Sequence, residues 1–176
     1  MKAIIIYRSK YGAAEQYAQM LAQQLGCEAM DVRHVTGLGQ YDTILFCGGV
    51  YANGIGGISF LKKNLSQLAG KRVAIFAVGA SPYEEKAMDA LKQRNLKGGL
   101  EDIPLFYGRG AWDEGRMSWK DRTMCRMLKK MVAKKDPSTY EPWEAALVSA
   151  GEKCSWVSPD YLFPLLEYCK ILDNKK

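Results

Sequence analysis

KAIIIY at residues 2–7 and RSKYG at residues 8–12 decide the fold that this sequence predicts. Three consecutive isoleucines are typical of a buried strand in a parallel sheet. After the turn, apolar side chains recur at the spacing of one helix face. They are Tyr17, Ala18, Leu21, Ala22 and Leu25. A strand, a short polar turn and a helix form the first half of a βαβ unit, so these residues predict an α/β protein.

The turn has the composition of an anion site. The hydroxyls of Ser9 and Tyr11 can donate hydrogen bonds, and Lys10 is cationic. Gly12 allows close approach of the backbone, and the start of a helix adds N–H groups and the positive end of the helix dipole. The turn lacks the Gly-Lys-Ser/Thr of a P-loop and the three glycines of a dinucleotide fingerprint. Phosphate binding and an ordinary βα turn without a ligand are the two interpretations.

Strands and helices alternate along the chain to residue 107. The further strands are expected at residues 27–32, 42–49, 72–78 and 103–107. Helices are expected between them at residues 58–68 and around residues 87–91, the second ending at Gly98-Gly99. Such alternation predicts a parallel sheet with helices on both faces. Distinctive loops follow three of the strands, at residues 9–14, 50–57 and 79–83. Because these loops share the carboxyl edge of the sheet, the sequence predicts a ligand site there.

The composition is typical of a soluble globular domain, with 48% hydrophobic and 25% charged residues. A chain of 176 residues can bury a sizeable core as one domain. The five cysteines are widely spaced and His34 is the only histidine, so disulfides are poorly supported and no metal site is expected. No apolar run reaches the length of a membrane span and no signal peptide is recognised, so we expect a cytoplasmic protein.

The first loop resembles the phosphate loop of the flavodoxin-like family, whose usual form is Ser/Thr-x-Thr/Tyr-Gly-x-Thr. Ser9, Tyr11 and Gly12 match this form, whereas Ala14 stands where the family has a threonine. The resemblance covers about residues 1–150. It implies a three-layer fold, a five-stranded parallel sheet of order 2-1-3-4-5, and flavin mononucleotide (FMN) as cofactor. The cofactor-binding residues that it implies are Ser9, Lys10, Tyr11, Gly12, Ala13, Ala14, Val50, Tyr51, Ala52, Asn53, Gly54, Val78, Gly79, Ala80, Ser81 and Tyr83.

Within this family, the chain resembles the short protoporphyrinogen IX dehydrogenase branch, which passes electrons to a quinone at the membrane. The likeness rests on the opening IIYRSKYG, the basic and aromatic stretch from Phe106 to Arg122, and EPWE at residues 141–144, which would open the last helix of the fold. It implies an FMN-dependent oxidoreductase of heme biosynthesis, without assigning a catalytic side chain. A general flavodoxin-type electron carrier and a flavin-free interaction domain of the same fold are the alternatives. A signalling receiver is disfavoured, because CGG at residues 47–49 lacks the aspartate that accepts its phosphate.

Positive charge is concentrated in residues 116–135. This segment holds eight basic residues and one acid, Asp121, so its own charge is +7. The whole chain has a net charge of +6, so the remaining residues sum to −1. On a helical wheel its apolar side chains share one side, which Asp121 interrupts. The helix either packs on the core or contacts anionic lipid headgroups at the inner face of the membrane, or an acidic redox partner. Nucleic-acid binding is not expected, since neither stacking aromatics nor a reading motif accompanies the charge. The apolar side consists of Met117, Met124, Cys125, Met127, Leu128, Met131 and Val132.

We expect a flavodoxin-like domain at residues 1–152, with the basic helix inserted at about 108–135, and a helical extension at residues 153–176. A helix is expected to run from Glu141 to Cys154, and a second one after Pro159. The extension is too apolar to remain in solvent, so it packs on the domain, covers a site or joins two copies of the chain.

Overall fold

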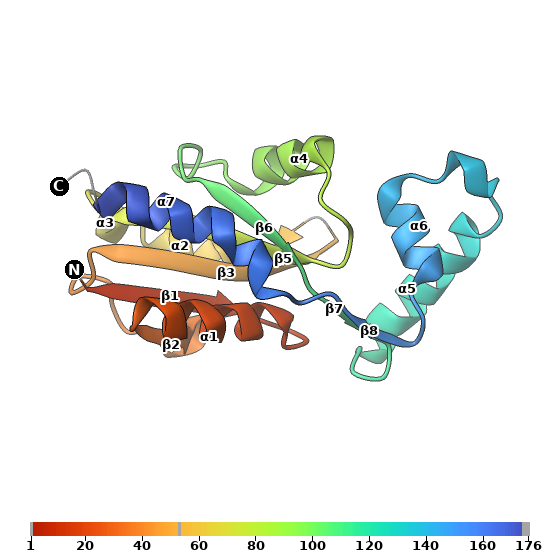
Figure 1. Cartoon of the computed structure of the whole chain (residues 1–176), viewed down its shortest axis with the longest axis horizontal. Helices are drawn as coiled ribbons and strands as arrows, with labels where there is room; N and C mark the ends of the chain where they lie inside the picture. Colours follow the sequence, from red (N-terminus) through yellow and green to blue (C-terminus); the bar gives the residue numbers. More distant parts are fainter. Residues whose placement is uncertain (1, 53, 174–176) are drawn as a thin grey trace.

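Five parallel strands form the centre of the computed structural model, which describes residues 2–52 and 54–173 (Figure 1). Numbered along the chain, the parallel strands lie side by side in the order 2-1-3-4-5, which confirms the predicted order. The strands at residues 3–8, 43–51 and 72–79 form where an apolar run predicts them, because both faces of a parallel sheet are buried. A two-residue strand, β4 (Gly54–Ile55), pairs antiparallel with the end of β3 and turns the second loop into a hairpin. The parallel strands are β2 (Glu28–Asp31), β1 (Ala3–Arg8), β3 (Thr43–Tyr51), β5 (Arg72–Gly79) and β6 (Leu105–Arg109).

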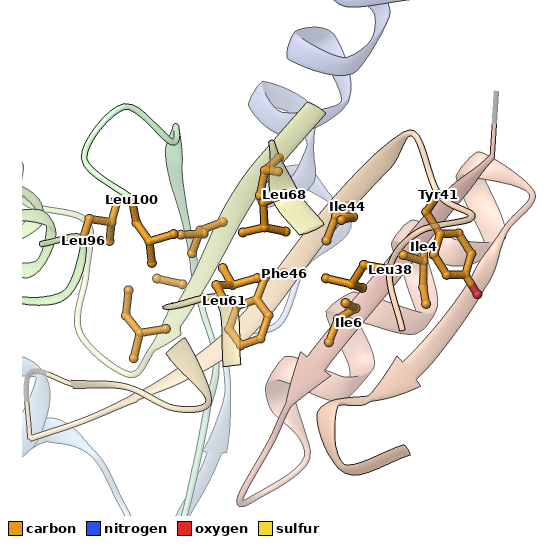
Figure 2. Close-up of a cluster of buried hydrophobic side chains, with 14 of the residues drawn as sticks. Ile4, Ile6, Leu38, Tyr41, Ile44, Phe46, Leu61, Leu68, Leu96 and Leu100 are labelled. Carbon is orange, nitrogen blue, oxygen red and sulfur yellow. The ribbon is translucent and has the colours of Figure 1, made fainter. Parts of the chain in front are cut away.

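Successive side chains of each strand are buried on opposite faces of the sheet. In β1, Ile5 belongs to one apolar cluster, and Ile4 and Ile6 belong to another. Figure 2 shows the second cluster, where Phe46 of the sheet lies beside Leu61 of a covering helix. Helices therefore cover both faces, as predicted. One face is covered by α1 (Ala13–Leu25) and α7 (Phe163–Asp173), and the other by α2 (Ile58–Lys63), α3 (Leu65–Leu68) and α4 (Glu85–Asn95).

The C-terminal helix α7 supplies part of the core. Leu165 of α7 and Leu162 of the preceding turn η3 (Pro159–Leu162) are fully buried, in the same cluster as Ile5 and Phe76 of the sheet. The helix that closes the fold over this face is thus α7. The expectation that EPWE opens the last helix of the fold is wrong, because the helix beginning there packs elsewhere.

Residues 111–156 extend beyond the end of β6 and form a small lobe, which we call the distal lobe (Figure 1). Strands β7 (Ala111–Asp113) and β8 (Lys153–Ser155) pair antiparallel at its base. Between them run α5 (Trp119–Val132), a short turn η2 (Pro137–Thr139) and α6 (Pro142–Ser149). The lobe has its own apolar cluster, centred on Trp112, Val132, Leu147 and Ala150. The inserted segment is therefore longer than the predicted 108–135 and includes α6.

The helix expected to reach Cys154 ends five residues earlier, at Ser149. Ala150 is its C-cap, and Gly151, a poor helix former, follows. Cys154 instead lies in β8, directly opposite Trp112 of β7. The apolar face at Trp143 and Leu147, which predicts this helix, packs in the apolar cluster inside the distal lobe.

The apolar side predicted for α5 is divided between the lobe and solvent. Val132 is buried and Cys125 is half-buried against the lobe cluster. Met124, Met127 and Met131 are 57–64% exposed, so this side of the helix does not pack on a core. Within residues 2–52 and 54–173, none of the helices combines the length and apolarity needed to span a bilayer.

Alkaline pH is expected to destabilise the fold through the buried Tyr17 and the half-buried Tyr107. Burial raises the pKa of Tyr17 and of Tyr107 to about 12 each, from about 10 in an unfolded chain. Between these two pKa values the unfolded chain binds fewer protons than the folded one. The stabilisation from the two hydroxyls is therefore fully present below about pH 10, and the free energy of unfolding falls as the pH approaches about 12. Urea unfolding at a series of pH values measures the decline. Tyr17→Phe should make it shallower, whereas the same change at the exposed Tyr83 should leave it as in the wild type.

Candidate functional site

The first loop joins β1 to α1 and presents helix N–H groups at the carboxyl edge of the sheet. Gly12 is the N-cap of α1, with a left-handed φ of +99°, and its N–H donates to Ser9 Oγ at 2.9 Å. The N–H of Gln16 donates to the carbonyl oxygen of Gly12 at 3.0 Å, which makes the first bond inside the helix. The N–H groups of residues 13–15 therefore have no acceptor within the helix and face the loop. Together with the helix dipole they favour an anion.

Tyr51, at the end of β3, links the first and second loops. Its hydroxyl accepts a hydrogen bond from the backbone N–H of Lys10 at 2.9 Å, and its ring lies edge-on to that of Tyr11, with the centroids 5.9 Å apart. Burial raises the pKa of the Tyr51 hydroxyl, which keeps it protonated. The ring also lies against Gly49, where a Cβ would come within 2.4 Å of the hydroxyl oxygen. A glycine at this position is thus required for the two loops to meet.

Side chains from the end of β6 hold the third loop. The Tyr107 hydroxyl donates to the carbonyl oxygen of Ser81 at 2.7 Å. The Arg109 guanidinium donates to the carbonyl oxygen of Ala80 at 3.1 and 3.2 Å, and lies 4.1 Å above the ring centre of Trp156. Backbone carbonyls that would otherwise vary in direction are therefore fixed, and the third loop is connected to the distal lobe.

A cavity of about 420 Å³ lies between the three loops and the distal lobe. Its loop wall is made of small residues with Tyr11 and Tyr51, and Tyr107 of β6 lies beside them. Its lobe wall is mostly apolar and aromatic. The residues of the lobe wall are Ala111, Trp112, Met117, Asp121, Met124, Cys125, Leu128, Trp143, Ala146, Leu147, Ala150 and Trp156. The apolar walls of the cavity thus suit a planar, apolar molecule, and the anion-binding turn lies beside the cavity.

The distal lobe also contacts the first loop through charged side chains. Asp121 of α5 accepts hydrogen bonds from the Lys10 ammonium and the Tyr11 hydroxyl, both through Oδ2. The hydrogen bond from Lys10 lowers the pKa of Asp121, so the carboxylate is charged. The Arg116 guanidinium lies over Gly12, with Nη1 3.5 Å from the position that a Cβ would take. A negative and a positive group of the lobe therefore lie at the turn that the sequence predicts for an anion.

A family model for the flavodoxin domain matches residues 4–139, well over half of the chain. The chain belongs to the flavodoxin-domain family. The match begins in β1 and ends in η2, so it includes the loops around the cavity and much of the distal lobe. No curated protein matches this flavodoxin domain.

The chain also has similarity to solved structures from several organisms. The Trp repressor binding protein from Bacillus subtilis is 16% identical, with a TM-score of 0.46 over 62% of this chain and 85% of that one. A WrbA-like flavodoxin from Agrobacterium tumefaciens is 14% identical, with a TM-score of 0.46 over 69% and 87% of the two chains. A mutant flavodoxin from Fusobacterium nucleatum, solved with bound flavin mononucleotide, is 15% identical, with a TM-score of 0.40 over 65% and 72%.

Most of the site residues predicted for this flavodoxin domain lie around the cavity. Ser9, Lys10 and Gly12 form the anion turn beside it without lining it, and Gly54, in the β4 part of the second loop, does not line it either. Tyr83 lies outside the cavity, 63% exposed, with its ring 6.3 Å from that of Tyr107. Asn53 is outside the described residues. Tyr11, Ala13, Ala14, Val50, Tyr51, Ala52, Val78, Gly79, Ala80 and Ser81 line the cavity.

The lobe wall of the cavity was not predicted by residue. Its side chains come from residues 111–156, none of which the sequence predicts as site residues. Asp121 did carry a signal, because it is the only acid among eight basic residues and interrupts an apolar helix side. An isolated acid in such a place suggests a specific partner, and Lys10 and Tyr11 are that partner.

Proposed function

We propose that this flavodoxin domain binds FMN and acts as a redox protein. The observation that carries the proposal is the convergence of three strand-end loops on one cavity beside an anion-binding turn. The cavity has the size of a small-molecule site. The Asp121 carboxylate supports a phosphate at the turn, since both groups are oxygen anions that bind ammonium and hydroxyl donors.

The residues present suit each part of the cofactor. The N–H groups of residues 13–15 and the side chains of Lys10 and Tyr11 would hold the phosphate. The small residues of the loop wall leave room for a flat ring between the second and third loops, and Tyr51 closes one end. When bound, FMN supplies the electron-accepting and electron-donating chemistry. The chain's own part is to bind the phosphate, orient the ring and exclude water.

A substitution at Ala14 measures what a side-chain hydroxyl at this position would contribute to phosphate binding. Ala14 is 2% exposed and lines the cavity. Ala14→Thr is expected to bind FMN more tightly than Ala14→Val by about 2- to 12-fold, because a neutral hydrogen bond contributes about 0.5–1.5 kcal/mol. Threonine and valine have nearly the same shape, so packing effects cancel in the comparison. Equal affinities, measured by flavin fluorescence, would mean that the phosphate does not lie at residue 14.

Within this function, we propose an oxidoreductase of the protoporphyrinogen IX dehydrogenase type, which passes electrons to a quinone. Support comes from the lobe wall, where Trp143, Trp156 and Leu147 face the loops across the cavity. Such a wall suits a large, apolar, planar second substrate. A general electron carrier needs its flavin open to a protein partner, and here the distal lobe covers that approach.

We further propose that α5 contacts an anionic membrane surface. Half of its charged side chains serve the lobe, as Arg126 does by pairing with Glu114 at 3.0 Å. Lys120 and Lys130 border the exposed methionines on the outer face, at the helical spacing of one side, and the exposed Lys134 follows two residues after the helix ends. Basic residues contribute about 1 kcal/mol each near anionic lipid, and the methionines can insert between headgroups. Sedimentation with anionic and with neutral vesicles tests this, and equal binding to both would refute it.

The visible absorption spectrum after addition of FMN and removal of the excess tests the main proposal. A retained flavin band is expected. If it is retained, anaerobic oxidation of protoporphyrinogen IX with a soluble quinone as acceptor tests the finer one. Flavin retention without turnover would favour the electron carrier. A colourless protein would favour the flavin-free interaction domain.

A further inference from the structure

Two charged side chains of the distal lobe meet the anion turn without belonging to the phosphate loop. Asp121 Oδ2 accepts from both the Lys10 ammonium and the Tyr11 hydroxyl. The N–H of Ser118 lies 3.4 Å from the Tyr11 hydroxyl oxygen, and Ser118 Oγ accepts from the Asp121 N–H at 3.2 Å. The first turn of α5 is therefore fastened to the first loop, across 110 residues of sequence.

Arg116, two residues before the N-cap of α5, reaches the same loop. Its backbone N–H donates to the carbonyl oxygen and to Oδ1 of Asp113, at 3.1 and 3.2 Å, which fixes the turn that carries it. Its guanidinium lies over Gly12, with Nη1 and Nη2 3.5 and 3.9 Å from the position that a Cβ would take. Gly12 is also the N-cap whose following amides face the loop. The guanidinium thus lies near those amides and is the one lobe cation described at this turn.

We propose that Arg116 is a phosphate ligand and that Asp121 is an internal competitor for the same phosphate, so that the two lobe residues set the phosphate affinity of the loop in opposite directions. The proposal rests on the proposed binding of FMN and assigns to the cofactor site two residues that lie outside its loops. Arg116 would supply, as a charge-assisted hydrogen bond, the interaction that Ala14 cannot make.

Competition follows from the donors that the two anions share. The Tyr11 hydroxyl has a single proton, which cannot be directed at a carboxylate and at a phosphate at once, so phosphate binding requires it to leave Asp121. The Lys10 ammonium has three N–H donors, and a phosphate would draw it away from the charge that it now neutralises on Asp121. Two negative groups at one turn also repel each other. Since Asp121 belongs to the first turn of α5, its release would free that end of the helix. Phosphate binding and movement of the lobe wall are then coupled through one carboxylate.

The test compares FMN with riboflavin, which carries the ring without the phosphate. Asp121→Asn is expected to raise FMN affinity about tenfold, and Arg116→Gln to lower it about tenfold, since hydrogen bonds to charged groups contribute roughly 1.5–3 kcal/mol and these side chains are partly in solvent. Riboflavin affinity should change less than twofold in both. Asp89→Asn in α4 and Lys130→Gln on the outer face of α5 remove the same charges at exposed positions and should change neither affinity.

Inorganic phosphate gives a second readout that needs no flavin. The melting temperature of Asp121→Asn should rise with phosphate concentration more steeply than that of the wild type, and that of Arg116→Gln less steeply. Unchanged FMN affinity and unchanged phosphate response in both variants would overturn the inference. If no variant binds FMN, the proposed function fails, and the phosphate response still decides whether the two residues act on an anion at this turn.

Discussion

Gly12→Val is expected to weaken FMN binding by about 5- to 150-fold in a protein that still folds. Gly12 has a φ of +99°, a region that a β-branched residue occupies only at a cost of about 1–3 kcal/mol. The strain is relieved if the peptide before α1 rotates, and that rotation turns away the N–H groups that face the loop. Binding affinity and the start of the helix therefore change together. Adding Ser9→Ala removes the acceptor of the Gly12 N–H and should enlarge the effect.

Gly26→Val is the matched control for this prediction. Gly26 caps the other end of α1, with a φ of +62°, and nothing lies within 4 Å of the position that its Cβ would take. Both variants carry the same side chain at a left-handed position of the same helix, so both lose stability. Only Gly12→Val should lose flavin affinity, measured by fluorescence titration at a temperature where circular dichroism shows both folded. Equal affinities in the two would remove the phosphate from this loop.

The sheet and the convergence of its loops could be predicted because they depend on local sequence. Strands such as the one at residues 72–78 are continuous apolar runs, and a parallel strand buried on both faces needs little else. Once the strands are parallel, their following loops must share one edge. Tyr51, Ala80 and Ser81 were therefore placed at the cavity by their position after a strand.

The distal lobe could not be predicted in the same way, because its contacts join residues far apart in the sequence. The apolar side of α5 predicts burial, yet periodicity cannot say against what. Val132 packs in the lobe cluster, whereas Met127 and Met131 are exposed to solvent. Tyr83 shows the opposite failure, since an aromatic residue in the expected loop turned away from the cavity. The third loop is held instead by Tyr107 and Arg109, from a neighbouring strand.

The last helix shows why the order of elements is harder to predict than their type. Residues 142–149 and 163–173 both have an apolar face, and either could close the sheet. What distinguishes them is the connection. The ladder of β7 with β8 returns the chain to the sheet only after α6, and Trp156 then donates its N–H to the carbonyl oxygen of Gly110 at 2.9 Å. The long insertion leaves α7 as the helix that can reach the open face beside α1.

Leu165→Ala is expected to lower the free energy of unfolding by about 2–5 kcal/mol and to leave FMN affinity unchanged in the folded protein. Leu165 is fully buried between α7 and the sheet, in the cluster that contains Ile5, Leu45 and Phe76. A cavity left by a truncated core leucine accounts for a loss of this size. The side chain does not line the ligand cavity, so the loops keep their geometry. Urea unfolding measures the stability, and flavin titration below the transition measures the affinity.

Phe163→Ala provides the control on the same helix. Phe163 is larger than Leu165 but 61% exposed, so its removal should cost less than about 0.5 kcal/mol. If Leu165→Ala lowers the free energy of unfolding as little as Phe163→Ala, α7 does not pack on the sheet and the residues after 158 are dispensable for stability. If Leu165→Ala alone is costly, the C-terminal helix is the outer layer of the domain. Stability and cofactor affinity then separate, because Gly12 controls the affinity at the carboxyl edge while Leu165 controls the stability on the covered face.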